Sequence, residues 1–165
     1  MAITKKPAAT AAAAKTDATA LLERDHRDVK KLFKQYEKLA DAEASGEERQ
    51  ALATQICTML TVHATVEEEI FYPAAREAEV DDDLLNEAEV EHASAKDLIA
   101  QIESMSPDDE LYDAKVTVLG EYIDHHVQEE EGEMFPKCRR AKMDLAGLAQ
   151  ELAERKSELM ADTPT

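Results

Sequence analysis

Four of the five histidines in this chain of 165 residues occupy the same kind of place in the sequence. Each follows an apolar residue by four positions, which puts the imidazole on the buried face of an amphipathic helix. These histidines are His26, His63, His92 and His126. A single histidine of this kind is more often an ordinary core residue. Four of them, buried without partners on four helical stretches, would cost about 1–3 kcal/mol each, and a shared metal ion removes that cost.

Two of these histidines are followed four residues later by a glutamate, giving the pairs His63/Glu67 and His126/Glu130. Residues four apart project from one side of a helix, so the imidazole and the carboxylate can reach the same ion. The segments HATVEEEIFYP and HVQEEEGEMFP align without a gap, and each is preceded by another histidine, 37 and 34 residues upstream. The sequence therefore predicts a twofold internal repeat of a helix pair.

As a metal site, the repeat supplies four imidazoles and two carboxylates. Two ions bridged by Glu67 and Glu130, each with two histidines, would have about four protein donors apiece. Nitrogen and oxygen ligands without a thiolate suit iron or manganese, with zinc as a further option. Such an ion keeps an exchangeable position where O₂, peroxide or NO can bind.

The elements that position these residues are predicted from apolar stripes with a period of 3.6 residues. Four long helices are expected at about residues 17–44, 47–78, from the acidic run 81–83 to before 106, and 108–142, the last with Leu111 on its stripe. Short connections imply antiparallel neighbours, so the predicted fold class is all-α, an up-down-up-down four-helix bundle. An extra C-terminal helix is expected at 145–160. The predicted organisation is thus a disordered tail (1–16), the bundle (17–143), and the C-terminal helix and tail (144–165).

Composition excludes other classes of protein. Aromatic residues are 4% of the chain, with no Trp, four Gly and five Pro, too few for a fold of many short strands. A net charge of −18 argues against nucleic acid or an anionic membrane as a partner. No segment has the length of a membrane span, and Cys57 and Cys138 fit reduced thiols. We therefore expect a cytoplasmic protein, with no protein partner identified by the sequence.

The pattern H…HxxxE…H…HxxxE, over about residues 20–140, resembles the hemerythrin-like HHE cation-binding family. The resemblance implies a four-helix bundle around a non-haem di-iron centre with an oxo or hydroxo bridge. In that family such a centre serves O₂ binding, O₂ or iron sensing, iron handling, NO interaction or peroxide breakdown. The implied metal ligands are His26, His63, Glu67, His92, His126 and Glu130.

One departure from the family pattern concerns the third and fourth helices. Hemerythrins that carry O₂ have a second histidine one turn from the first on the third helix, and an aspartate on the fourth. Here Ala88 and Lys96 stand one turn either side of His92, and the fourth-helix carboxylate is Glu130. The centre is therefore more open than in an O₂ carrier, or another residue completes it. The candidates are Tyr122, one turn before His126, and Glu89 and Glu23, each three residues before a histidine.

Three functions fit these residues. The leading expectation is a di-iron protein that binds O₂, NO or peroxide, with slow peroxide breakdown as a potential activity. The alternative is a module for iron or oxygen sensing, or for iron handling, without catalysis. A ferritin-like oxidase ranks last, because its pattern has no use for a histidine one turn before each glutamate. Phe71, Tyr72, Met134 and Phe135 are expected in the core below the site, and the acidic runs 67–69 and 129–131 mostly on the solvated surface.

Overall fold

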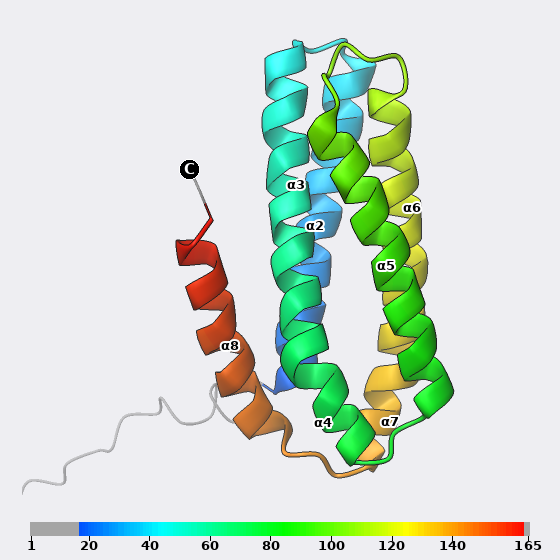
Figure 1. The fold of residues 1–165 in the computed structure, drawn as a ribbon, viewed down its shortest axis with the longest axis vertical. Coiled ribbons are helices and arrows are strands. Elements are labelled where there is room, and N and C mark those ends of the chain that lie inside the picture. The colour runs from blue at the N-terminus through cyan, green and yellow to red at the C-terminus, as the bar shows by residue number, and fades with distance from the viewer. Residues whose placement is uncertain (1–16, 164–165) are drawn as a thin grey trace, which may run out of the picture.

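The fold is known from a computed structural model that describes residues 17–163, so the tail predicted at 1–16 lies outside the described residues. Helices form four long columns and a shorter fifth one (Figure 1). The first and third columns are α2 (Ala18–Asp41) and α5 (Asp82–Ser104). The second and fourth each contain a π-helical segment: α3 (Gly46–Val66), η1 (Glu67–Phe71) and α4 (Tyr72–Glu77), then α6 (Tyr112–Glu129), η2 (Glu130–Met134) and α7 (Phe135–Arg140). The fifth is α8 (Leu145–Ala161).

Helix starts follow from capping side chains. The Asp17 carboxylate accepts a hydrogen bond from the backbone N–H of Ala20, and Ser45 caps α3 in the same way. The predicted start of the fourth column at 108 was wrong. The chain makes a turn there instead, closed by the backbone N–H of Ser106 donating to Asp109, and Leu111, predicted on the apolar stripe, is 58% exposed.

The four columns run alternately up and down, and α8 lies against the outside of α2 and α3 (Figure 1). The predicted all-α bundle with an additional C-terminal helix is confirmed. Leu152 anchors α8 in the core, while Arg155 and Lys156 pair with Glu69 and Asp25 of the bundle. No helix among residues 17–163 is both long and apolar enough to cross a membrane.

The apolar core is divided into two clusters at different heights of the bundle. The cluster nearer α4 and α7 includes Leu22, Val66 and Ala88, and the other includes Val29, Leu60 and Ala95. On three helices the predicted ligand histidine falls between a residue of one cluster and a residue of the other. The fold therefore places a polar layer between two apolar ones.

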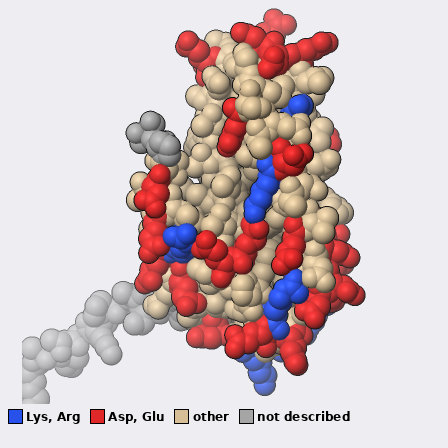
Figure 2. All heavy atoms as spheres, in the orientation of Figure 1, with Lys and Arg blue, Asp and Glu red and all other residues tan. Residues whose placement is uncertain are grey.

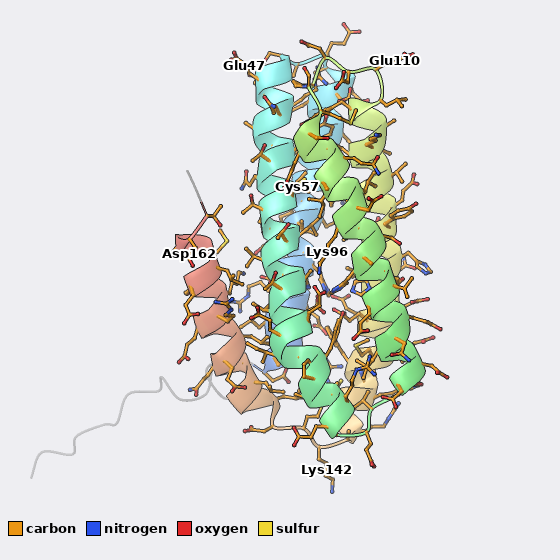
Figure 3. The ribbon with its side chains drawn as sticks, viewed as in Figure 1. Glu47, Cys57, Lys96, Glu110, Lys142 and Asp162 are labelled. Carbon is orange, nitrogen blue, oxygen red and sulfur yellow. The ribbon has the colours of Figure 1, made fainter. Side chains whose placement is uncertain are left out.

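Both cysteines belong to the apolar layers and are free. Burial raises the pKa of the Cys57 and Cys138 thiols to about 12, so both stay protonated. Cys57 lies between the Glu47 end of the bundle and the level of Lys96 (Figure 3). The thiols therefore do not compete with the histidines as ligands for a metal ion.

Candidate metal centre

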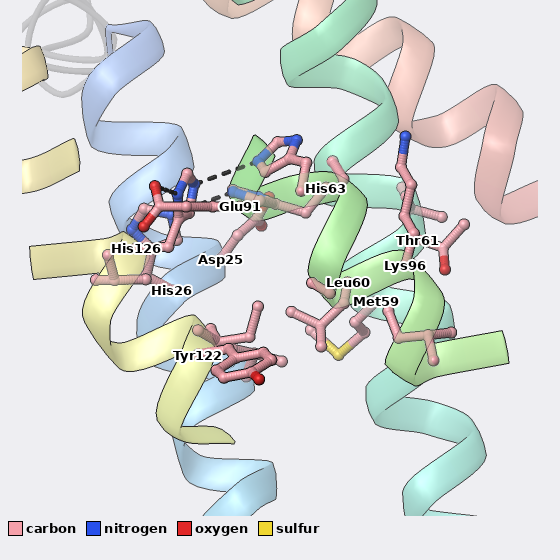
Figure 4. A pocket seen from close by; sticks show the side chains of 18 of the residues that line it. Asp25, His26, Met59, Leu60, Thr61, His63, Glu91, Lys96, Tyr122 and His126 are labelled. Atoms are coloured by element: carbon pink, nitrogen blue, oxygen red, sulfur yellow. Dashed lines mark hydrogen bonds and ion pairs between the residues drawn. The ribbon is translucent and has the colours of Figure 1, made fainter. Parts of the chain in front are cut away.

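The six predicted ligands come together in the polar layer. The glutamates are the most buried of them, with exposed fractions of 0% for Glu67 and 1% for Glu130. Three of the histidines are also buried and His63 is nearly so. In the close view, imidazoles from α2, α3 and α6 converge at one end of a cavity (Figure 4). Two overlapping groups of potential ligands result: His26, His63, Glu67 and Glu130, and Glu67, His92 and His126.

The histidines face each other in two pairs through their Nε2 atoms. The Nε2 atoms of His26 and His63 are 3.1 Å apart, and those of His92 and His126 are 3.2 Å apart. Each pair joins the two helices of one half of the repeat. Two ring nitrogens at this distance repel unless a proton or a cation lies between them.

The two glutamates connect the histidine pairs. Glu67 Oε1 lies 2.6 Å from His63 Nε2 and 3.7 Å from His92 Nε2. Glu130 directs Oε1 to His26 Nε2 at 3.3 Å and Oε2 to His126 Nε2 at 3.1 Å. Each carboxylate thus contacts one histidine of each pair, as a ligand shared by two ions would.

Several buried oxygen atoms at the centre have no hydrogen-bond partner among residues 17–163. Within this part of the chain, Glu67 Oε2 has neither a hydrogen bond nor an ion pair, whereas Glu67 Oε1 and Glu130 Oε1 approach only histidine Nε2 atoms. Leaving buried ionised oxygens unpaired costs more than leaving neutral groups unpaired. A cation between the histidine pairs would satisfy them, so the donor set fits a metal ion.

Each imidazole also has a carboxylate at its other ring nitrogen. The Nδ1 atoms of His26, His63 and His126 lie 3.0, 2.9 and 3.0 Å from Glu131, Asp25 and Glu91, and His92 Nδ1 lies 3.5 Å from Glu68. An Nδ1–H that donates to a carboxylate leaves the Nε2 lone pair directed into the centre. The acidic runs expected on the solvated surface therefore supply two partners, Glu68 and Glu131.

These carboxylates follow the internal repeat. Asp25 and Glu91, each directly before a histidine in the sequence, serve the other histidine of their own half. Glu68 and Glu131, each directly after a central glutamate, reach a histidine of the opposite half. The two halves are consequently joined at the centre by side chains that cross between them.

Neighbouring carboxylates favour the protonated form of His63 and of His126, one histidine of each pair. Burial opposes the charge on His63, but the Glu67 and Asp25 carboxylates outweigh it and raise the pKa of His63 to about 10. Burial likewise opposes the charge on His126, whose pKa is raised to about 11 by Glu130 and Glu91. Burial alone would raise the pKa of Glu130, yet its contact with His126 holds that pKa well below its usual value. A metal ion that binds at either pair must displace a proton.

Metal affinity is therefore expected to rise with pH. Between about pH 6.5 and about 9, the apparent affinity for Zn²⁺ should increase up to about tenfold per pH unit for each ion, because each ion releases one proton. Calorimetric titration in buffers of different ionisation enthalpy measures this release. The stability of the metal-free fold depends on pH in the opposite direction. The stabilisation of the folded state by protonated His63 is complete below pH 6.5 and is lost as pH rises through about 10. An affinity that is flat with pH would contradict the role of these imidazoles.

Each central glutamate begins a π-helical segment, which sequence analysis missed. The backbone N–H of Tyr72 donates to the carbonyl of Glu67, five residues back, and that of Phe135 donates to Glu130 in the same way. A proline follows each segment, at Pro73 and Pro136. In a regular α-helix the proline ring would clash with the carbonyl four residues before it, and a widened turn relieves that clash. The repeated FYP and MFP endings were the sequence signal for these segments.

The π-helical turn brings Tyr72 into the centre, where sequence analysis expected only core packing. Its buried hydroxyl donates to Glu130 Oε2 at 2.6 Å and lies 3.2 Å from His92 Nε2 and 3.4 Å from His126 Nε2. Burial and the nearby carboxylates raise the pKa of Tyr72 well above its ordinary value. The corresponding residue of the other half, Phe135, stacks on His26 and has no hydroxyl. The two halves of the repeat therefore differ by one oxygen donor, the Tyr72 hydroxyl.

The three residues considered as additional ligands lie elsewhere. Glu23 pairs with Arg139, and Glu89 pairs with Arg76, both away from the buried cluster. Tyr122 is 49% exposed and lines a cavity beside the histidines. It forms no hydrogen bond to them among residues 17–163. None of the three forms a hydrogen bond or ion pair with the six predicted ligands in the part of the chain that the structure describes, whereas the Tyr72 hydroxyl does.

A third group of potential ligands lies on the surface beside the centre. It consists of Glu91, His125 and Glu129, with His125 Nε2 at 3.6 Å from Glu91 and 3.2 Å from Glu129. The His125 side chain is exposed. Glu91 contacts His126 through its other oxygen, so it belongs to both groups.

Asp25→Asn is expected to weaken Zn²⁺ binding about tenfold, the lower end of the effect for carboxylates that orient a ligand histidine. The amide oxygen can still accept from His63 Nδ1, but without the charge that makes the imidazole a better donor to a metal. Asp28→Asn, at an exposed position of the same helix, is the matched control. Competition with a chelating dye measures both affinities. Equal affinities for the two variants would show that Asp25 does not act on His63.

Comparison with known proteins agrees with this geometry. The family model described as Hemerythrin HHE cation binding domain matches residues 17–138. A DNA nickase of Nostoc sp. (strain PCC 7120 / SAG 25.82 / UTEX 2576) is 31% identical over 115 residues, which are 70% of this chain and 31% of that protein. The chain therefore spans about a third of the length of this relative. A hemerythrin HHE cation-binding domain-containing protein of Mycobacterium kansasii has a similar fold, with a TM-score of 0.73, 24% identity and 88% of each chain covered.

Proposed function

Since the chain belongs to the hemerythrin HHE cation-binding domain family, we propose that its buried histidines and glutamates hold two iron ions that bind O₂, NO or a peroxide. The observation that carries this proposal is the pairing of four Nε2 atoms around two carboxylates that each contact both pairs. The proposed ligands are His26, His63, Glu67, His92, His126 and Glu130, with Tyr72 as a further oxygen donor.

Iron or manganese is proposed from the donor types, which are nitrogen and oxygen without a thiolate. Two donors at right angles on a six-coordinate ion, each about 2.1 Å from it, are about 3.0 Å apart, whereas on a tetrahedral ion they are about 3.4 Å apart. The observed separations of 3.1 and 3.2 Å lie between these two values, so they fit either geometry. Six-coordination favours small-molecule binding, because the residues at each pair supply fewer than six donors.

Iron in such a centre supplies electrons to, or accepts them from, a bound small molecule. The chain's own residues prepare the place where this happens. Glu67 and Glu130 couple the two positions, and the carboxylates at the Nδ1 atoms increase the basicity of the imidazoles. The Tyr72 hydroxyl adds a donor at the His92 and His126 pair alone. With Tyr72, the group around His92 and His126 has four potential ligands, as many as the group around His26 and His63, and a small molecule can bind at an open position of either ion.

Reconstitution with ferrous iron without oxygen, followed by air or peroxide, tests the proposal. We expect about two irons per chain, as the two ligand groups predict, and new near-ultraviolet absorption after oxidation. Metal analysis and absorption spectra give both results. Absence of iron uptake, or one ion without the new absorption, would overturn the proposal and leave a bundle that binds some other cation.

The alternative function is sensing or handling of iron without catalysis. The observation that favours it is that the ligands come from four helices, so a bound metal holds both halves of the bundle together. The rate of peroxide loss in the presence of the iron-loaded protein separates the two functions. Turnover supports the first, and stoichiometric reaction with stabilisation of the fold supports the second.

Nucleic acid is not a proposed partner, although the Nostoc relative is named as a DNA nickase. The chain has 37 acidic and 19 basic residues, and carboxylates cover much of the face seen in Figure 2. Such a surface repels a phosphate backbone. The name of the relative describes a protein of which this chain matches 31%.

A further inference from the structure

A large cavity adjoins the histidine side of the centre. It has a volume of about 780 Å³, lies on the side of the second apolar cluster, with Val29, Leu60 and Ile99 in its walls, and reaches the four ligand histidines. The imidazoles and carboxylates stand at one end of the view, and Tyr122, Leu60 and Met59 face them from the other (Figure 4). At about 30 Å³ per molecule, the cavity has room for about 26 waters. O₂, NO or hydrogen peroxide needs only a small part of this volume.

The walls of the cavity away from the histidines are mainly apolar. Val29, Met59, Ile99 and Ile123 contribute to them. Apolar walls with a few polar groups at one end are typical of sites for small organic molecules, as is a volume of about 300–1,000 Å³. The cavity therefore fits an apolar body whose polar end faces the histidines.

Part of the rim of the cavity is also apolar, among exposed polar side chains that include Gln55, Ser94 and Lys96. Among residues 17–163, four large apolar side chains are exposed, and three of them, Val90, Tyr122 and Met160, line this cavity. Exposed apolar side chains that gather at one opening mark a place where apolar molecules bind or enter. The fourth, Leu111, is in the turn before α6.

Charge balance at the centre indicates a neutral polar end. Six carboxylates surround the four imidazoles: Asp25, Glu67, Glu68, Glu91, Glu130 and Glu131. Two divalent ions, with the ammonium groups of Lys96 and Lys156 that pair with Glu68 and Asp25, balance these charges. No excess positive charge remains to hold an anionic group, whose burial would be costly.

We propose that this cavity binds a neutral molecule with an aliphatic body and a terminal oxygen group, an alcohol or an organic hydroperoxide, with the oxygen towards the histidines. The proposal rests on the proposed function for the identity of the metal, but the cavity itself can be tested without iron. The proposed ligand differs from hydrogen peroxide in having an apolar body.

The test uses 1-octanol as the probe and the methyl groups of methionine as reporters, in Zn²⁺-loaded and in metal-free full-length protein. Met59 and Met160 line the cavity, whereas Met134 and Met143 do not. We expect the NMR signals of the first two to shift and saturate with 1-octanol, and those of the second two to stay. Octanoate, which has the same body but a charged end, should bind at least about tenfold more weakly.

Substitutions in α5 provide the control. Ala95→Phe puts a ring into the cavity and should weaken 1-octanol binding at least about tenfold, whereas Ala93→Phe, at an exposed position of the same helix, should not. Thr58→Phe, at a half-buried position in the cavity wall, serves if Ala95→Phe does not fold.

An unshifted Met59 signal, equal shifts of all methionines, or octanoate binding as tight as that of 1-octanol would each overturn the inference. Failure of the inference and failure of the proposed function are distinguishable. Protein that takes up two irons but leaves Met59 unchanged with 1-octanol refutes only the cavity proposal, and protein that binds 1-octanol but no iron refutes only the di-iron proposal.

Discussion

Glu67→Ala protein, reconstituted with ferrous iron, is expected to keep less than one iron per chain instead of about two, because Glu67 belongs to both groups of potential ligands. Loss of metal should also remove the stabilisation that metal gives. At a metal concentration about a thousandfold above Kd this stabilisation is about 4 kcal/mol, or roughly 8–16 °C in Tm for a chain of this size. Metal analysis and calorimetry with and without iron measure the two effects.

Glu133→Ala is the matched control for this substitution. Glu133 lies two residues after the acidic run 129–131 and is exposed, so its removal changes the net charge by the same amount without touching the centre. We expect iron content and the metal-dependent rise in Tm to stay as in the parent chain. Full iron occupancy in Glu67→Ala would refute the metal centre as described.

Tyr72→Phe is expected to weaken binding of one of the two irons by up to about 100-fold. The substitution removes the hydrogen bond to Glu130 and an oxygen at the His92 and His126 pair, and groups of either kind contribute about 10–100-fold in metal affinity. If the phenol oxygen binds ferric iron, the visible absorption that this contact produces will disappear in the variant. Iron titration and absorption spectra give the two readings.

Tyr122→Phe is the matched control for Tyr72→Phe, because it also removes a phenol hydroxyl. Tyr122 lines the cavity but makes no hydrogen bond to the centre among the described contacts. Its variant should keep the parent affinity and spectrum. If the Tyr72→Phe protein behaved like Tyr122→Phe, Tyr72 would only pack in the core, as sequence analysis expected.

The helices and the six proposed ligands were accessible from the sequence because they depend on local spacing. A stripe with a period of 3.6 residues determines which face of a helix is buried, and His63 and Glu67 are only one turn apart. Capping is local too, as the contact of Asp17 with Ala20 at the start of α2 shows. The fold class therefore followed without any knowledge of how the helices pack.

The parts of the site that sequence analysis missed depend on changes of period or on packing. In a regular helix with 3.6 residues per turn, Tyr72 would point away from the face that carries Glu67. The π-helical segment brings both side chains to the same face. The partners of His26 and His92 come from the opposite half, so they depend on how the halves dock. Leu111 was misplaced because a turn capped by Asp109 interrupts the stripe.

The carboxylates that cross between halves have a consequence for the order in which the chain folds. Helix hairpins form from contacts between residues near in sequence, whereas His26 and Glu131 are 105 residues apart. Contacts of such separation form late, because closing long loops costs entropy before the contacts stabilise anything. The centre therefore becomes complete only when the two formed hairpins dock. Metal binding is thus expected to be a late step of folding and not its nucleus.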